Sequence, residues 1–252
     1  TNKGIANALN QIVSKSVDDL GASWTLLMDQ DSVFKTNPFA EFGKYIGDDI
    51  AIVCPAIHDD NYGTFKTKDY TVTEIGICIT SGSYINNKVW KNVCGFDDRL
   101  FIDSVDTDYS IKVTMAGYKT LRIGSVCLNH ELGHTEKHLF KSATNHNAIR
   151  RYYIARNSYY LSLCYSRIFK LQGLKQTEIN KINSFFDHHT SPSRVLLRQL
   201  QFVLIVILYE KNKIKKIKAI FNGLKEGLEM FRKENIQIPS YVNKKNFLII
   251  TH

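Results

Sequence analysis

The stretch that most constrains the fold is 24–32, where an apolar run ends abruptly in two carboxylates. The apolar residues up to Met28 predict a strand that is buried on both faces. Asp29 and Asp31 would then emerge at the carboxyl edge of this strand, where open α/β sheets bind ligands. Two carboxylates one residue apart can hold a Mg²⁺ ion and leave its other positions to water and anionic oxygens. The alternative is an ordinary polar exit from a strand, in which Asp29 stabilises a turn.

Composition predicts a globular protein. The chain has 252 residues, of which 44% are hydrophobic and 12% aromatic, so it can bury a sizeable core. Its five cysteines are widely spaced and lie mostly in apolar runs, which is typical of buried thiols in a reducing compartment. The first residue is not Met, and nothing at Thr1 resembles a signal peptide. We therefore expect the sequence to begin partway through a longer product or after processing.

Apolar periodicity predicts alternating helices and strands over the first half of the chain. The expected helices lie near 5–13, 38–45 and 89–94, and the expected strands near 24–28, 51–57, 75–80 and 121–128. The small residues Thr80, Ser81 and Gly82 predict a turn where a ligand can approach the backbone closely.

A second acidic cluster is formed by Asp103, Asp106 and Asp108, just before a helical pattern. Acidic residues are favoured in the first turn of a helix, so the cluster is also typical of an ordinary helix start. The next predicted strand is followed by His130. Carboxylates from both clusters and this imidazole could therefore face one crevice.

The last third of the chain is predicted to be helical and basic. Residues 187–252 contain 12 Lys and Arg but 5 Asp and Glu, and so carry +7 of the total charge of +9. The apolar run at 193–209 is too short for a membrane span, and Arg198 within it makes it too polar. Lysines follow at 211–218. This pairing indicates a helix that lies on an anionic membrane, or a packed helix with a solvated lysine face. The basic residues form no recognisable nucleic-acid-binding motif.

Seven short motifs follow one another along the chain. They are Asn2-x-Gly4-x-Ala6-x-Ala8-x-Asn10, Asp29-Gln-Asp31, Thr80-Ser-Gly82, Gly95-Phe-Asp-Asp98, Val105-Asp-Thr-Asp108, Gly117-Tyr118 and Asn129-His130-Glu-Leu-Gly133. Their order and spacing resemble the family 2 glycosyltransferases, and most of all the bacterial rhamnosyltransferases within that family. The Arg- and Tyr-rich segment 150–157 strengthens this resemblance, which covers about residues 2–171.

The resemblance implies a GT-A fold, an α/β architecture in which a mixed sheet is flanked by helices. It also implies a nucleotide-sugar donor and a divalent cation, Mg²⁺ or Mn²⁺. By position, Asp29, Asp31 and His130 match the metal site, and Asp106 matches the catalytic base. Many family members have an acidic residue where Val105 stands, although the rhamnosyltransferase subgroup resembles this chain there.

Further donor-binding residues are expected from the same resemblance. They are Asp29 itself, Thr80, Ser81, Gly82, Arg150, Arg151 and Arg156. The three arginines could pair with diphosphate oxygens through forked hydrogen bonds, although a helix surface rich in Arg can equally be solvated.

The resemblance also divides the chain. Residues 1–144 are expected to form a GT-A catalytic core that lacks the first β-α-β segment, and residues 145–252 a helical, basic extension. The expected enzyme is an inverting rhamnosyltransferase, a hexosyltransferase that transfers rhamnose from dTDP-rhamnose to a polysaccharide or lipid-linked acceptor of the cell envelope. A UDP-sugar donor is the alternative. We expect a cytoplasmic protein that is peripheral on the inner face of the cell membrane. Whether it forms homo-oligomers stays an open question.

One motif indicates a different class of enzyme. His130-Glu-Leu-Gly-His134 matches the H-E-x-x-H signature of zinc peptidases. Such a peptidase needs both histidines within one long helix, whereas the preceding residues 121–128 predict a strand. Gly133 also lies between the two histidines. The sequence therefore disfavours a peptidase.

Overall fold

The computed structural model describes residues 2–59, 63–64, 71–130, 136–137, 142–143, 146–243 and 245–246. The chain forms two compact units. The sheet unit comprises Thr1–Arg99 and Val105–Leu132, and the helical unit comprises Leu100–Ser104 and Gly133–His252. The division lies before the boundary at residue 144 that the sequence predicts, and five residues from the middle of the chain belong to the helical unit.

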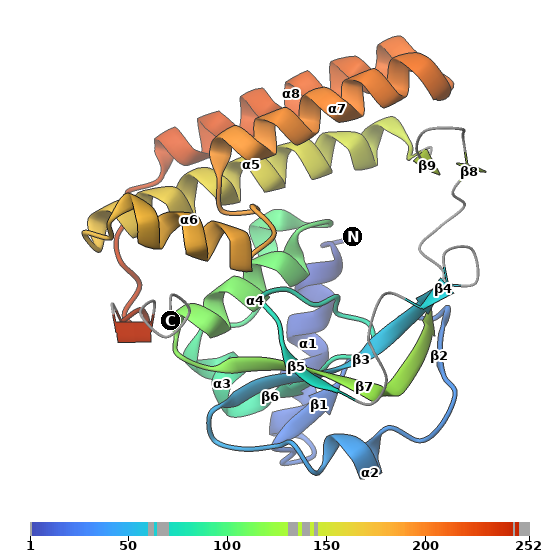
Figure 1. Ribbon diagram of the computed structural model, residues 1–252, viewed down its shortest axis with the longest axis vertical. Helices are drawn as coiled ribbons and strands as arrows, with labels where there is room; N and C mark the ends of the chain where they lie inside the picture. Colours follow the sequence, from blue (N-terminus) through green and yellow to red (C-terminus); the bar gives the residue numbers. More distant parts are fainter. Residues whose placement is uncertain are drawn as a thin grey trace. The chain divides into compact units, whose positions relative to one another are not determined.

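The sheet unit contains a mixed sheet flanked by helices, which is consistent with a GT-A-like fold (Figure 1). The strand order is β1-β6-β3-β7-β2, with β4 paired to β3 and β5 paired to β7. β3 and β7 are parallel, and the other pairs are antiparallel. The strands are β1 Trp24–Leu26, β2 Ser32–Phe34, β3 Ile50–Asp59, β4 Gly63–Thr64, β5 Val72–Glu74, β6 Tyr84–Asn86 and β7 Lys119–His130. The helices are α1 Ile5–Asp18, α2 Phe39–Phe42, α3 Asn87–Asn92, the 3₁₀ helix η1 Asp98–Leu100 and α4 Val105–Met115. A separate two-stranded sheet pairs β8 Glu136–Lys137 with β9 Ser142–Ala143.

The long parallel pair β3 and β7 forms the centre of the sheet. A core of apolar side chains packs around it and includes Val53, Ile123 and Val126. The predicted strands at 51–57 and 121–128 are thus confirmed. The strand predicted at 75–80 is wrong, because the paired strand β5 ends at Glu74 and the residues after it form irregular structure, in which the Ser83 hydroxyl donates to the carbonyl oxygen of Ile79 over 2.6 Å.

β1 differs from the prediction of a strand buried on both faces. It lies at one end of the strand order and pairs with β6, so that Thr25 stands opposite Ile85. Leu27 is 2% exposed, whereas Met28 is 41% exposed. The apolar run therefore buries one side at its end, and the chain turns outward before Asp29.

The cysteines are free thiols. Cys54 and Cys164 are buried as the sequence predicts, but Cys94 is exposed. Cys94 lies in the turn after α3 with a φ of 60°, next to Gly95 with a φ of 63°.

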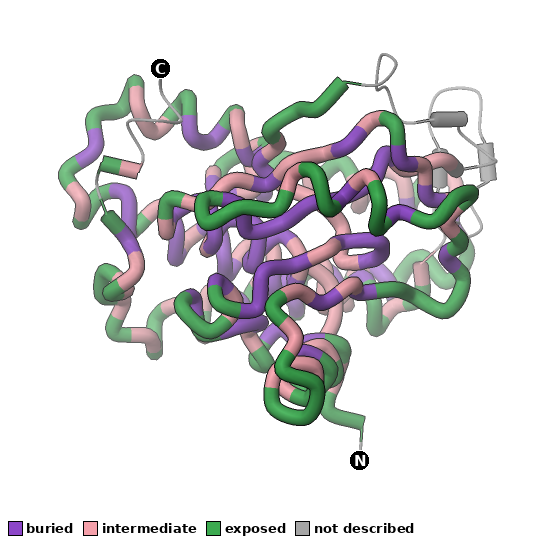
Figure 2. The backbone as a smooth tube through the Cα atoms, turned by 90° about the horizontal axis from the view of Figure 1, so that it is seen from below, coloured by how far each residue is buried: buried purple, intermediate pink, exposed green. Residues whose placement is uncertain are grey.

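The helical unit is built on four helices. They are α5 Ala148–Leu171, α6 Gln176–Phe185, α7 Pro192–Tyr209 and α8 Lys213–Lys233. Figure 1 shows α5, α7 and α8 running side by side, and α5 packs most extensively on α8. Buried and exposed positions alternate along the helical turns, as expected when each helix packs one side against its neighbours (Figure 2).

Two glycines allow α8 to approach α5 closely. A Cβ atom at Gly223 would lie 2.3 Å from the carbonyl oxygen of Tyr152, and one at Gly227 would lie 2.5 Å from that of Arg156. Both distances are far below van der Waals contact. The spacing of four residues places both glycines on the same face of α8, so the two helix backbones touch along this face.

A buried ion network lies at the turn between α7 and α8. Glu210 is 3% exposed and pairs with Arg151 of α5 and, over 2.8 Å, with Lys216 of α8. The Arg151 guanidinium also lies 5.1 Å from the centre of the Phe202 ring. Lys216 is therefore not part of the solvated lysine face that the sequence suggests, because its ammonium group neutralises a buried carboxylate.

We expect Gly223→Ala to lower the melting temperature by roughly 5 °C or more, because the added methyl group must push α8 away from α5. Helix propensity alone predicts the opposite sign, since Ala stabilises a helix interior by about 1 kcal/mol relative to Gly. Thermal unfolding followed by far-ultraviolet circular dichroism measures the shift. The neighbouring exposed residue gives a matched control, Asn222→Ala, which should not lower the melting temperature. A Gly223→Ala protein as stable as the parent would contradict the close packing.

Candidate active site

The segment 80–83 runs beside the end of β1. The backbone N–H of Leu27 donates to Ser83 over 2.9 Å, and that of Gly82 donates back to Leu27 over 2.8 Å. A Cβ atom at Gly82 would lie 2.8 Å from Leu128 and 2.9 Å from Pro55. Side chains of β3 and β7 therefore fill the space beside this glycine, which the sequence had assigned to a ligand.

Ser81 anchors the acidic loop that follows β1. Its hydroxyl accepts a hydrogen bond from the backbone N–H of Asp29 over 3.1 Å and donates to the Ser32 hydroxyl over 2.7 Å. Ser81 is 1% exposed and Ser32 is 8% exposed, so both bonds are shielded from water. The exposed Asp29 and Asp31 thus project from a loop whose two ends are held by buried hydroxyl groups.

His130 reaches the same loop through its backbone. It is the last residue of β7 and stands opposite Ser32 in the pairing of β2 with β7. Its side chain lies outside the described residues, as do Glu131 and His134, so the prediction that His130 binds metal stays a prediction. His130 nevertheless ends a strand, whereas a zinc-peptidase motif requires a helix there. This geometry does not support a peptidase.

The donor atoms at this edge suit a hard cation. Asp29 and Asp31 offer carboxylate oxygens to solvent, and Mg²⁺ is commonly bound by one or two carboxylates together with water and substrate phosphates. Among the side chains that the structure describes, no group of three His, Cys, Asp or Glu residues is arranged as a complete protein-only metal site. The two carboxylates therefore fit a cation that shares its coordination with a diphosphate.

The three acidic residues of the second cluster have different environments. Asp108 is 2% exposed and pairs with Lys112 over 3.0 Å, which gives it a structural role. Asp103 pairs with Arg150 over 3.3 Å; burial raises the pKa of its carboxyl group, and the Arg150 charge opposes this rise. Asp106 instead lines a small cavity of the sheet unit.

The cavity beside Asp106 lies next to the segment that binds the loop of the first acidic cluster. Its lining includes Cys78 and Thr80, next to Ser81, which holds the backbone of Asp29. One Asp106 oxygen accepts a hydrogen bond from the N–H of Thr107 over 2.8 Å. The backbone of Asp29 and the side chain of Asp106 thus both lie beside the segment 78–83, and the shared crevice stays a prediction.

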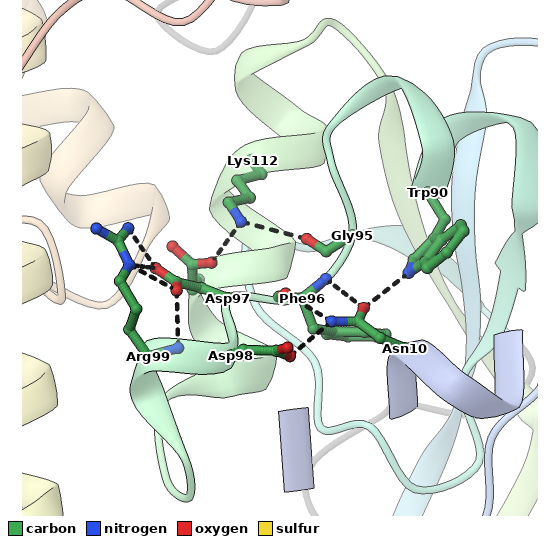
Figure 3. Close-up of polar contacts among 9 residues, drawn as sticks. Asn10, Trp90, Gly95, Phe96, Asp97, Asp98, Arg99 and Lys112 are labelled. Carbon is green, nitrogen blue, oxygen red and sulfur yellow. Dashed lines mark hydrogen bonds and ion pairs between the residues drawn. The ribbon is translucent and has the colours of Figure 1, made fainter. Parts of the chain in front are cut away.

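Asn10 of α1 binds the backbone of Phe96, a residue that lines this cavity (Figure 3). Its side chain donates to the carbonyl oxygen of Phe96 over 2.9 Å and to Asp98 over 2.8 Å, and it accepts from the N–H of Phe96 over 2.9 Å. A Cβ atom at Gly95 would lie 2.7 Å from this amide, which explains the glycine. The Phe96 ring packs on Tyr109 of α4, with ring centres 4.5 Å apart, so that Asn10 helps to set the position of α4.

Sequence reasoning missed the role of Asn157. Its buried amide nitrogen lies 2.8 Å from the carbonyl oxygens of Leu100 and Ile102 and 2.9 Å from that of Asp103. These residues belong to the loop 100–104, which directly precedes α4. The loop holds three residues with φ near 60° that are not glycine, namely Phe101, Asp103 and Ser104. Such left-handed conformations cost free energy, and a buried donor can stabilise them. The Arg-Asn pair at the end of the 150–157 motif was the available signal.

The arginines expected to bind diphosphate have other partners within the helical unit. Arg151 is 2% exposed and is paired with Glu210, so a solvent-borne diphosphate does not reach it in this conformation. Arg156 is 8% exposed and donates to Leu100 over 3.2 Å and to Asn157 over 2.8 Å. Arg150 is half exposed and pairs with Asp103. Diphosphate binding by these arginines stays a prediction, and the geometry favours Arg150 as the accessible candidate.

We expect Asn157→Asp to lower the free energy of unfolding by on the order of 3 kcal/mol, because buried carbonyl groups lose their donor and face a carboxylate. Urea unfolding measures this loss, and hydrogen exchange of the segment 100–104 should become faster. Asn222→Asp makes the same chemical change at an exposed helix position and should leave the urea midpoint nearly unchanged. Equal midpoints for Asn157→Asp and the parent would show that these hydrogen bonds do not stabilise the loop.

Comparison with known proteins supports the class of enzyme that the motifs indicate. No family model matches the chain. The chain is 24% identical over 251 aligned residues to the dTDP-rhamnosyl transferase RfbF of Shigella flexneri, and the alignment covers 90% of this chain and 76% of that protein. At this identity the similarity does not extend to an individual donor or acceptor. Together with the mixed sheet and its paired acidic clusters, it supports a glycosyltransferase role.

Proposed function

We propose that this protein is an inverting glycosyltransferase that transfers rhamnose from dTDP-rhamnose to a hydroxyl group of an acceptor saccharide. The observation that carries the proposal is the joint contact of Asp29 and Asp106 with the segment 78–83. It supports a site in which Asp29 would bind a cation and Asp106 would act as the base. The similarity to a dTDP-rhamnosyl transferase supports the choice of donor.

The leaving group is handled by the loop after β1. Asp29 and Asp31 would hold a Mg²⁺ or Mn²⁺ ion, which when bound stabilises the negative charge that develops on the departing diphosphate. Ser81 fixes the backbone of Asp29 before any donor arrives, so the loop loses little conformational entropy when it binds. Arg150, which is half exposed and paired with Asp103, is the arginine that we propose to bind a diphosphate oxygen.

The acceptor is activated by Asp106. Its carboxylate would accept the proton of the attacking hydroxyl while the acceptor oxygen bonds to the anomeric carbon and the bond to the diphosphate breaks. Attack from the face opposite the leaving group inverts the anomeric configuration. Asp106 lies in the first turn of α4, a position where acidic residues are generally favourable.

The acceptor that we propose is a polysaccharide or a lipid-linked saccharide of the cell envelope, glycosylated in the cytoplasm. This acceptor rests on the resemblance of the motifs to the bacterial rhamnosyltransferases. A UDP-sugar donor is the alternative within the same fold. A screen of donors separates the two.

We expect the protein to release dTDP from dTDP-rhamnose, in the presence of a saccharide acceptor, faster than it releases nucleotide from UDP- or GDP-sugars. The release should require Mg²⁺ or Mn²⁺, and Asp29→Asn and Asp31→Asn should each raise the cation concentration at half-maximal rate. Asp49→Asn alters an exposed carboxylate that pairs with Lys119 and serves as the control. Metal-independent turnover that both site variants retain would remove the metal assignment, and faster turnover of a UDP-sugar would change the donor.

We expect Asp106→Asn to lower the rate of transfer by roughly 10²–10⁴-fold, because the acceptor hydroxyl loses its general base. Donor affinity, measured by calorimetry with the unreacted nucleotide dTDP, should stay close to that of the parent. Asp108→Asn removes a carboxylate two residues away that is tied to Lys112, so it should reduce stability rather than the turnover of the folded protein. Parent-like transfer in Asp106→Asn would contradict the assignment of the base.

A further inference from the structure

One side of α7 is apolar and faces solvent. Its buried residues are Val195, Gln199 and Val206. Large apolar residues on the opposite side have 44–64% of their surface exposed, and they are Leu197, Leu200, Leu204, Ile207 and Leu208. Their spacing of three and four residues places them along a single stripe of the helix. A stripe of this length is unusual on a water-facing helix, because each exposed leucine forgoes the free energy of burial.

The length of α7 also corrects the expectation that this segment is too short and too polar for a membrane. The helix has 18 residues with a mean hydropathy of 1.3, and by length and composition alone it is long and apolar enough to span one. A single helix of this kind is weak support for a span, and α7 also packs on α5 and α8. Attachment along a surface fits these contacts, because it needs the outer stripe and leaves the packed side in place.

Positive charge surrounds the end of this stripe. Exposed lysines follow α7 in the turn and along α8, and they are Lys211, Lys213, Lys215, Lys218 and Lys225. Exposed apolar residues lie among them: Ile214 is 85% exposed and Phe221 is 51% exposed. The spacing from Ile214 through Lys218 and Phe221 places these residues on one face of α8.

Negative charge is absent from the exposed surface of the hairpin between residues 192 and 225. This stretch contains a single acidic residue, Glu210. Glu210 is 3% exposed and is neutralised by Arg151 and Lys216. The stretch therefore presents leucine, isoleucine and lysine to solvent with no exposed carboxylate, whereas the half-exposed Glu226 and Glu229 lie in the second half of α8.

We propose that the hairpin of α7 and α8 docks on an anionic lipid surface. The stripe of α7 enters the boundary between headgroups and acyl chains, and the lysines of the turn and of α8 contact lipid phosphates. A second copy of the chain is a poorer occupant, because a symmetric contact through this face would bring lysines toward lysines. This inference does not depend on the sugar-transfer reaction.

The test is cosedimentation of the full chain with vesicles, without donor or acceptor. We expect binding to vesicles of phosphatidylglycerol mixed with phosphatidylcholine, little binding to pure phosphatidylcholine, and loss of binding as NaCl is added. The double variant Lys213→Glu and Lys215→Glu should bind anionic vesicles at least roughly tenfold more weakly than the parent. Leu204→Ser with Leu208→Ser should also weaken binding. Lys216 is left unchanged because it is buried.

The matched control is Lys88→Glu with Lys91→Glu, which changes the net charge equally through two exposed lysines of α3. It should bind the anionic vesicles like the parent. Circular dichroism verifies that every variant is folded, and light scattering reports the oligomeric state. Failure of the parent to bind anionic vesicles at low salt would overturn the proposal, as would equal binding to neutral vesicles. A dimer that Leu204→Ser with Leu208→Ser converts to monomers, in a parent that ignores vesicles, would assign the stripe to a second copy.

Nucleotide release measured in solution separates this proposal from the proposed reaction. The hairpin variants contain no residue of the candidate active site, so they should release nucleotide at the parent rate in the absence of vesicles. A parent protein that binds anionic vesicles but releases no nucleotide would contradict the proposed reaction and support the docking surface. A parent protein that releases nucleotide but does not bind the vesicles would contradict the docking surface and support the reaction.

Discussion

Close contact between the backbones of α5 and α8 is the constraint on which the helical unit depends. Gly223 and Gly227 permit this contact, and it fixes the rotation of α5 about its own axis. With that rotation set, Arg151 points at Glu210 and Asn157 points at the loop before α4. A buried ion pair alone adds little net stability, since desolvation offsets the attraction, but it penalises every arrangement that leaves one charge unpaired. Packing of α5 on α8 thus stabilises the helical unit, and the buried charges favour the arrangement of the helices in which each charge is paired.

The sheet unit uses a different device, in which small polar side chains bind backbone groups. Ser81 holds the loop that carries Asp29, and Asn10 holds the segment around Phe96, which packs against α4. In both places a residue with few rotatable bonds fixes a loop that carries or supports a charged residue. A carboxylate that is held by its own backbone stays open to solvent and to ligands. This part of the sheet unit therefore combines a rigid frame with the exposed carboxylates of Asp29 and Asp31.

The sequence predicts the helices and strands of this protein better than it predicts which side chains contact one another. The β-branched runs of β3 and β7 and the apolar pattern of α4 depend on neighbouring residues, and the structure confirms them. The segment 75–80 is also apolar but forms no strand, because the paired strand there ends at Glu74. The shared site of Asp29 and Asp106 stays a prediction. The burial of Arg151 does not follow from motif order, because its partner Glu210 is distant in sequence and lies in a run of lysines that reads as solvated.

The hydrogen bonds from Asn157 to the loop 100–104 also affect the order in which parts of the chain fold during synthesis. The carbonyl groups of this loop leave the ribosome more than fifty residues before the amide that binds them. At the usual rate of translation this gap lasts about three to ten seconds. During that time the turn before α4 has left-handed residues without their stabilising donor, so the nascent chain can complete the sheet before it completes the approach to Asp106. A gene that ended after the last strand of the sheet would hence encode the acid without the support for its helix.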